Sequence, residues 1–184
     1  RGEKGGHMET GLLVIRVVLG AIVAAHGAQK LFGWFGGPGL AGTGGWLEAM
    51  GLRPGRMWAA VNGLAEFGGG ALLVLGLITP LGSAAVAGVM LVAIATVHWR
   101  NGFFNSNGGY EFNLLIVAAA IALAFTGPGT ISIDDLAGWT LAGPEWGLAA
   151  LGVSVVAAGS VLAMRKPRPE QAQDETSREE APAG

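Results

Sequence analysis

The sequence predicts an all-α integral membrane protein, a four-helix membrane bundle with an additional C-terminal transmembrane helix. Three observations support this fold class. The chain of 184 residues is 51% hydrophobic and only 13% charged, whereas soluble domains usually carry about a quarter charged residues. Long apolar runs rich in Ala, Gly, Val and Leu recur along it, and basic residues gather on one side of these runs. An isolated apolar hairpin could not satisfy its backbone hydrogen bonds in lipid, so the runs are predicted to be helices.

Five apolar runs are candidates for membrane spans, since about 20 residues of helix cross the hydrocarbon core. They cover residues 11–32, 57–78, 81–99, 111–126 and 145–164, and the fourth is short. Residues 1–10 are predicted to be an N-terminal extension, residues 11–139 the four-helix domain, residues 145–164 the additional helix, and residues 165–184 a disordered charged tail. Small residues four apart, such as Gly20 and Ala24, predict close helix packing.

The basic residues predict the orientation in the membrane. They lie at the same ends of the first four spans and directly after the fifth: Lys30, Arg53, Arg56, Arg100, Arg165, Lys166 and Arg168. The opposite loops, "ITPLG" and "GPGTISIDDLAGWTLAGPE", contain no Lys or Arg. We therefore expect a bacterial inner-membrane protein with its N-terminus outside and its C-terminus in the cytoplasm.

The first predicted cytoplasmic connection, "GWFGGPGLAGTGGWLEAMGLRPGR", indicates a short helix at the membrane interface. Thr43 is predicted to cap this helix, which carries Trp46, Leu47 and Met50 on neighbouring positions. An aromatic belt is expected at the same interface. Its predicted members are Trp34, Phe35, Trp46, Trp58 and Trp99.

Composition excludes several classes of function. The net charge of −2 and the lack of a basic stripe argue against nucleic-acid binding. The chain has no cysteine, which excludes disulfides, thiol catalysis and iron–sulfur ligation. A redox role would therefore rest on a bound cofactor, a quinone-like molecule or a partner protein. No H-x-x-x-H or E-x-x-H spacing indicates a metal site, and no glycine run matches a nucleotide-binding motif.

Ionisable residues inside the predicted spans carry the functional signal, since each costs roughly 2.5–3.5 kcal/mol on insertion scales. Glu66 lies near the middle of its span. Arg16, His26 and Lys30 lie within an arc of about 80° on one face of the first span. A structural ion pair of Glu66 with Arg16 or His26 is one interpretation, and a glutamate that handles protons or anchors a ligand is the other. Arg16 and Lys30 could instead extend to opposite interfaces.

His98 and Glu111 flank the predicted turn between the third and fourth spans. They are either ordinary interfacial residues or members of a site with His26 and Glu66 in the cytoplasmic half of the bundle. The candidates for ligand binding or proton handling are therefore His26, Lys30, Glu66, His98 and Glu111. No residue is assigned a catalytic role.

Several motifs in order give the chain a specific resemblance over residues 12–139. They are Arg16 with Gly20, "HGAQKLFG" (26–33), "MGL" (50–52), "AEFGGGALLVLGLITPLG" (65–82), His98 with "GFF", "GGYEFNLL" (108–115) and "GPGTISID" (127–134). With these motifs the sequence resembles the DoxX family of small bacterial membrane proteins. The resemblance implies a four-helix membrane bundle and an association with redox metabolism, including quinone-coupled sulfur oxidation and membrane oxidoreductase complexes that respond to oxidative stress. The fifth apolar run and the tail depart from that plan.

These observations favour an accessory subunit of a membrane redox system, with a polar intramembrane site for a quinone-like or other small aromatic molecule. In this hypothesis His26 or His98 hydrogen-bonds the head-group carbonyl and Glu66 supplies or accepts the proton. The alternatives are a membrane scaffold that recruits soluble oxidoreductases and a small proton-coupled transporter. The expected partners are the lipid bilayer, soluble or membrane oxidoreductases, and a second copy of the chain.

Overall fold

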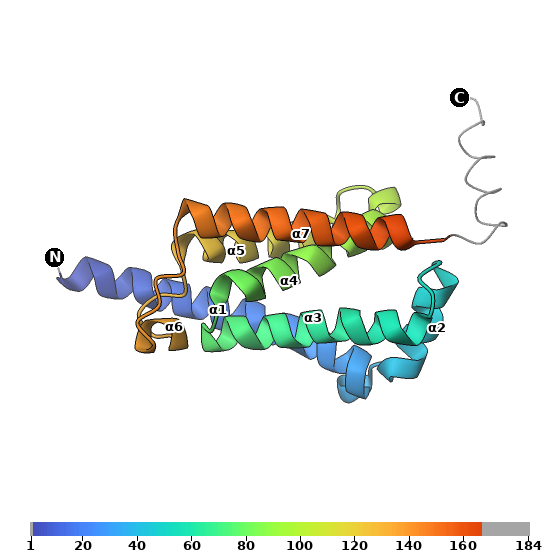
Figure 1. Ribbon diagram of the computed structural model, residues 1–184, viewed down its shortest axis with the longest axis horizontal. Coiled ribbons are helices and arrows are strands. Elements are labelled where there is room, and N and C mark those ends of the chain that lie inside the picture. The colour runs from blue at the N-terminus through green and yellow to red at the C-terminus, as the bar shows by residue number, and fades with distance from the viewer. Residues whose placement is uncertain (1, 167–184) are drawn as a thin grey trace, which may run out of the picture.

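The computed structural model describes residues 2–166, which form helices joined by turns and contain no strand (Figure 1). Four helical segments are long and apolar enough to cross a membrane: Gly6–Phe32, Gly55–Leu75, Thr79–Asn101 and Pro144–Met164. Glu111–Thr126 is apolar but shorter, and its 16 residues span about 24 Å. The all-α membrane fold class, with a C-terminal transmembrane helix, is thereby confirmed. Most of the predicted tail, residues 167–184, lies outside the described residues.

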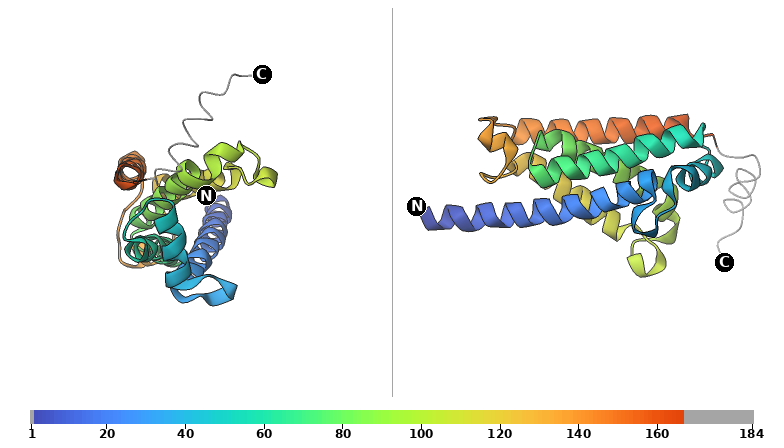
Figure 2. Two further views of the ribbon diagram at one scale, coloured as in Figure 1. Left: turned by 90° about the vertical axis from the view of Figure 1, so that its right-hand side faces the viewer. Right: turned by 90° about the horizontal axis from the view of Figure 1, so that it is seen from below.

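The long helices agree closely with the predicted spans. They are α1 (Gly2–Phe32), α3 (Gly55–Leu75), α4 (Thr79–Ala93), α5 (Glu111–Thr126) and α7 (Pro144–Met164). Helix α1 starts at Gly2, so the stretch predicted as an extension is part of it, and its first turns project beyond the other helices (Figures 1 and 2). Helix α4 continues through a π-helical turn, η2 (Ile94–His98), and a 3₁₀ turn, η3 (Trp99–Asn101).

The connection after α1 folds into the 3₁₀ turn η1 (Trp34–Gly36) and the helix α2 (Gly39–Ala49). The prediction that Thr43 caps this helix is wrong, because α2 begins at Gly39 after Pro38. Thr43 lies inside α2 with its hydroxyl buried. The short helix expected here does exist, but it starts about one turn earlier because Pro and Gly, rather than Thr, precede its first turn.

The long helices pack in two groups that α4 joins. Helices α1 and α2 lie on α3, while α5 and α7 lie on α4, and α3 contacts α4 directly (Figure 2). The additional helix α7 is therefore packed into the bundle. Buried apolar residues from α1, α3, α4 and α5 form the main core: Val23, Leu73, Val86, Ala87, Met90, Ile116, Val117, Ala120 and Leu123.

Glycines set the antiparallel register of α1 and α3. A Cβ on Gly20 would lie 2.5 Å from the Gly70 carbonyl oxygen, and a Cβ on Gly27 would overlap the backbone nitrogen of Phe67. The two backbones can approach this closely only because side chains are absent at the contact. Close approach of small residues is how helices associate in lipid, where no hydrophobic force draws them together. This register decides which charged residues meet inside the bundle.

Candidate functional site

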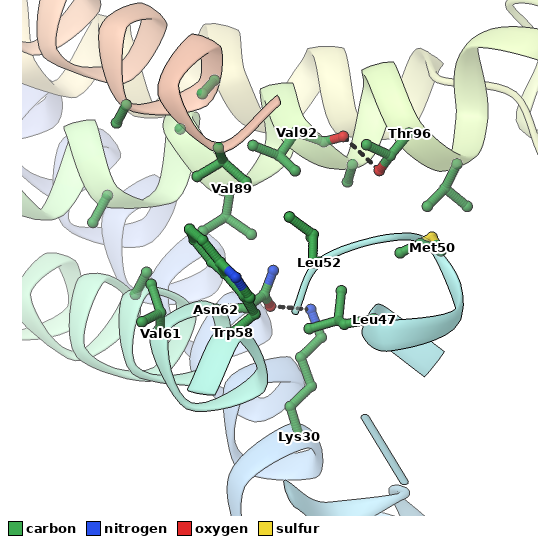
Figure 3. Close-up of a pocket in the computed structure, with 18 of the residues that line it drawn as sticks. Lys30, Leu47, Met50, Leu52, Trp58, Val61, Asn62, Val89, Val92 and Thr96 are labelled. Carbon is green, nitrogen blue, oxygen red and sulfur yellow. Dashed lines mark hydrogen bonds between the residues drawn. The ribbon is translucent and has the colours of Figure 1, made fainter. Parts of the chain in front are cut away.

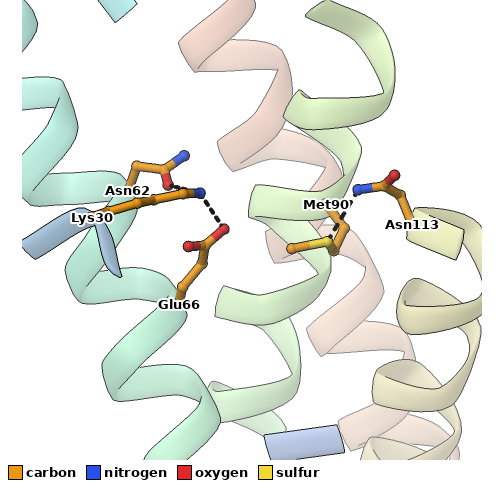
Figure 4. Close-up of polar contacts among 5 residues, drawn as sticks. All are labelled: Lys30, Asn62, Glu66, Met90 and Asn113. Carbon is orange, nitrogen blue, oxygen red and sulfur yellow. Dashed lines mark hydrogen bonds and ion pairs between the residues drawn. The ribbon is translucent and has the colours of Figure 1, made fainter. Parts of the chain in front are cut away.

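Glu66 forms an ion pair with Lys30 inside the bundle. Glu66 lies in the middle of α3 and is 2% exposed. Lys30, in the last turn of α1, donates from Nζ to Glu66 Oε1 at 2.5 Å and to Asn62 Oδ1 at 2.8 Å (Figure 4). Asn62 precedes Glu66 by four residues, so both face α1 from the same side of α3. The partner of Glu66 is therefore Lys30, whereas the sequence analysis considered Arg16 or His26 for this ion pair.

This Lys30–Asn62–Glu66 site is incompletely satisfied. Glu66 Oε2 is buried and has no hydrogen-bond partner within the described residues. Lys30 has three N–H donors, and its two contacts account for two of them. A buried oxygen without a donor costs about 1–3 kcal/mol. The site therefore retains one hydrogen-bond acceptor and one donor for a ligand, a water molecule or a proton.

An apolar cavity of about 260 Å³ adjoins this site. Lys30 and Asn62 form a polar edge of the cavity, and Figure 3 shows Trp58 beside them. The apolar walls come from α2, α3, α4, α7 and the adjacent turns. Residues in them include Trp46, Leu47, Met50, Leu52, Val61, Ala84, Gly88, Val89, Val92, Val153, Ala157 and Val161.

The cavity is elongated along α4. Its lining residues on that helix and its extension run from Leu81 to Val97, a length of roughly 20–25 Å. The Thr96 hydroxyl on this wall already donates to the Val92 carbonyl oxygen at 2.8 Å. An occupant would therefore meet polar partners mainly at Lys30 and Asn62 and apolar walls elsewhere. Such a cavity suits an amphiphile with one polar end.

The predicted Arg16–Glu66 ion pair is wrong. Arg16 is 1% exposed, and its guanidinium donates to the carbonyl oxygens of Pro128 at 2.9 Å and Ile131 at 2.5 Å. In the antiparallel register Arg16 lies opposite Gly76, at the far end of α3 from Lys30. Arg16 and Lys30 are 14 residues apart, or about 21 Å along the helix. The register therefore delivers Lys30, and not Arg16, to Glu66.

Asp134 is an important buried residue that the sequence reasoning missed. It lies in the short helix α6 (Ile133–Leu136) and is 1% exposed. Its carboxylate accepts from the backbone nitrogens of Ile78 and Thr79, at 2.7 and 3.0 Å, and from the Thr79 hydroxyl at 2.8 Å. It therefore caps the first turn of α4 from a distant loop. The available signal was an acid that ends the "GPGTISID" motif in a loop without basic residues.

The remaining candidate residues make contacts elsewhere. His98 Nδ1 lies 2.7 Å from the Gly108 carbonyl oxygen, and Glu111 Oε1 accepts from the Asn105 backbone nitrogen at 2.8 Å. Both contacts hold the loop between α4 and α5 in shape. His26 is exposed on α1. Within residues 2–166 no hydrogen bond or ion pair links His26, His98 or Glu111 to Glu66, as the alternative of a shared site would require. These residues also contain no group of three or more His, Asp or Glu residues arranged to hold a metal ion.

Comparison with known proteins agrees with this architecture. The DoxX family model matches residues 11–99, which include Lys30, Asn62 and Glu66. "Inner membrane protein YqjF" from Escherichia coli (strain K12) is 35% identical over 130 residues, covering 70% of this chain and 92% of the relative. The chain belongs to the DoxX family. "Putative oxidoreductase CatD" from Bacillus subtilis (strain 168) is 33% identical over 126 residues, covering 68% of this chain and 86% of that protein. No solved structure matches the chain.

Proposed function

We propose that this DoxX-family protein is an accessory subunit of a membrane redox system and binds a quinone-like molecule in the cavity beside Lys30. One observation carries the proposal: Lys30, which has an unused donor and forms an ion pair with the buried Glu66, borders an elongated apolar cavity together with Asn62. A quinone has the matching chemistry, because its carbonyl oxygens accept hydrogen bonds and its ring and side chain are apolar.

The site assigns distinct tasks to its side chains. The remaining Lys30 N–H donates to a quinone carbonyl oxygen, and the positive charge favours the electron-rich, reduced state of the ring. Glu66 exchanges the proton through Oε2, which has no hydrogen-bond partner in residues 2–166. The chain contains no cysteine, so the electrons come from a partner oxidoreductase. Lys30 thereby takes the role first considered for His26 or His98.

Aromatic residues support a planar ligand. Trp46 and Trp58 both line the cavity, and Trp58 lies one helical turn before Asn62 on α3 (Figure 3). Aromatic rings stack or meet edge to face with a gain of about 0.5–1.5 kcal/mol beyond the area they bury. A quinone ring held by Lys30 would lie within reach of such a contact.

The comparisons support the same context. One relative carries the name of an inner membrane protein and another the name of a provisional oxidoreductase. We propose that this protein lies in the inner membrane, and the distribution of its Lys and Arg residues favours an N-terminus outside and a C-terminus in the cytoplasm. In that orientation Lys30 and the loop between α4 and α5 lie at the cytoplasmic side, where a soluble oxidoreductase partner would dock.

Titration of the purified full-length protein with a short-chain quinone tests the proposal. We expect saturable quenching of tryptophan fluorescence, because Trp46 and Trp58 line the cavity. Lys30→Met and Glu66→Gln should each weaken binding about 10–100-fold, the range for losing a hydrogen bond that involves a charged group. Isothermal titration calorimetry gives the affinity independently of fluorescence.

His26→Ala is the matched control. His26 lies one turn before Lys30 on the same helix but is exposed, so its removal should leave the affinity unchanged. Quinone affinity that is equal in the wild type and in folded Lys30→Met and Glu66→Gln variants would contradict the proposed site. A loss of quinone affinity in His26→Ala alone would instead assign the hydrogen bond to the quinone carbonyl to His26.

A further inference from the structure

Two segments far apart in the sequence meet where α7 ends. Arg165 Nε donates to the Met50 carbonyl oxygen at 2.7 Å, and the Lys166 backbone nitrogen donates to the Gly51 carbonyl oxygen at 2.9 Å. Arg53 and Arg56 follow these carbonyl groups by only a few residues, in the turn between α2 and α3 and at the start of α3. The contact therefore gathers four basic residues, the α7-end basic cluster: Arg53, Arg56, Arg165 and Lys166.

No carboxylate in residues 2–166 forms an ion pair with the cluster. The ion pair between Lys30 and Glu66 lies in another part of the bundle and involves none of the four cations. The nearby Glu48 uses Oε2 to accept from the Gly55 backbone nitrogen at 3.2 Å. Arg165 engages the protein through Nε, which leaves its two terminal NH₂ groups as donors. Like charges held together in this way repel each other, and an anion bound between them would remove the repulsion.

The surroundings of the cluster are amphiphilic. Met57 and Met164 adjoin it in sequence and are 49% and 59% exposed, and Trp46 of α2 is 50% exposed. Met57 and Met164 belong to the ends of α3 and α7, which are both long and apolar enough to span a membrane. Cations at such helix ends lie at the level of lipid head groups, with apolar side chains facing the acyl chains.

We propose that the α7-end basic cluster binds the phosphate of an anionic phospholipid. The phosphate lies between the turn joining α2 to α3 and the end of α7, with the cluster cations around it, and the acyl chains rest on Met57 and Met164. Bound in this way, the lipid ties α7 to the α1–α3 half of the bundle. The site uses neither Lys30 nor Glu66, so its cations are distinct from the polar groups of the proposed quinone site.

The experiment measures lipid binding to the full-length protein in detergent, by native mass spectrometry and by the shift of the unfolding temperature. Phosphatidylglycerol should bind and raise the unfolding temperature, whereas phosphatidylcholine with the same acyl chains should do so much less. The double variant Arg53→Gln with Arg56→Gln should lose about 10–30-fold in phosphatidylglycerol affinity, because each basic residue near a lipid surface contributes about 1 kcal/mol. Quinone affinity should stay unchanged in this variant, which also verifies its fold.

Arg100→Gln is the control, because Arg100 lies in η3, outside the contact between the turn and α7. It should keep its phosphatidylglycerol affinity. Equal binding of phosphatidylcholine, or an equal loss in Arg100→Gln, would overturn the site in favour of general charge attraction. Equal affinity for soluble glycerol phosphate would overturn the assignment to a lipid.

Discussion

Two buried charged clusters lie at opposite ends of the α1–α3 contact, and each keeps one buried atom without a hydrogen-bond partner in residues 2–166, Arg16 Nε in one and Glu66 Oε2 in the other. At one end, Arg16 donates to two loop carbonyl groups and Asp134 accepts three hydrogen bonds. At the other end, Lys30 meets Glu66 and Asn62, and Glu66 Oε2 remains without a partner in the described chain. Both clusters are anchored by a basic residue of α1 and lie along the α1–α3 contact.

The difference lies in what surrounds each cluster. Around Arg16 the loop at 127–134 folds over the helix ends, and a Cβ on Gly76 would overlap the guanidinium, so little space remains. Glu9 extends this closure by accepting from the Thr130 backbone nitrogen at 2.6 Å. Around Lys30 the chain instead leaves a cavity. We infer that the first cluster stabilises the fold and that the second is maintained for binding.

The largest effect on stability is expected from Arg16→Met. It removes the donors of the Pro128 and Ile131 carbonyl groups and leaves the buried Asp134 carboxylate without its neighbouring cation. Losing one partner of a buried charged contact costs about 3–5 kcal/mol. Unfolding of the purified protein in mixed micelles measures this loss. His26→Ala, an exposed change on the same helix, should stay within about 0.5 kcal/mol of the wild type.

Gly27→Ala should cost about 1–3 kcal/mol, because the new methyl group would meet the Phe67 backbone and push α1 from α3. Since both charged clusters depend on this contact, quinone affinity should fall together with stability. Gly68→Ala is the matched control: nothing lies within 4 Å of its Cβ position. Stability of Gly27→Ala equal to that of Gly68→Ala would contradict the glycine-set register.

Glu111→Ala should cost about 1 kcal/mol, since it removes the acceptor of the Asn105 backbone nitrogen and loosens the loop between α4 and α5. Glu111→Gln keeps an acceptor oxygen and should cost less. Neither variant should change quinone affinity. Weaker quinone binding in both Glu111 variants, measured by calorimetry, would show that Glu111 contributes to the ligand site.

The smallest effect on stability is expected from a double variant, Lys30→Met with Glu66→Leu. Replacing a buried ion pair by apolar residues of similar volume is often neutral or stabilising, so its free energy of unfolding should lie within about 1 kcal/mol of the wild type, while quinone binding should disappear. Arg16→Met with Asp134→Leu should remain destabilised, because backbone groups of Ile78 and Thr79 lose their acceptor. Equal stability losses in the two double variants would remove the distinction between the clusters.

Much of the fold follows from local sequence patterns. The observed bounds of α5 are those of the predicted span, and α7 begins one residue earlier than predicted. The agreement is close because long apolar runs that end at Gly, Pro or charged residues have few stable forms in a membrane other than a helix. The prediction of a polar site around Glu66 depended on the same reasoning, since a carboxylate in the middle of an apolar span needs a partner. The identity of that partner did not follow from periodicity, because Arg16, His26 and Lys30 share one face of α1.

The sequence by itself determined that this chain is a helical membrane protein and that Glu66, in the middle of an apolar span, requires a polar partner. It left open whether Arg16 and Lys30 are buried or extend to the interfaces. Only the tertiary structure decided which partners they have. The close contacts of Gly20 with Gly70 and of Gly27 with Phe67 set the α1–α3 register, and that register brings Lys30 to Glu66 and Arg16 to the loop before Asp134. The physical reason is that helical periodicity fixes a residue's direction around its own axis, whereas its height relative to another helix depends on how closely the two backbones can pack.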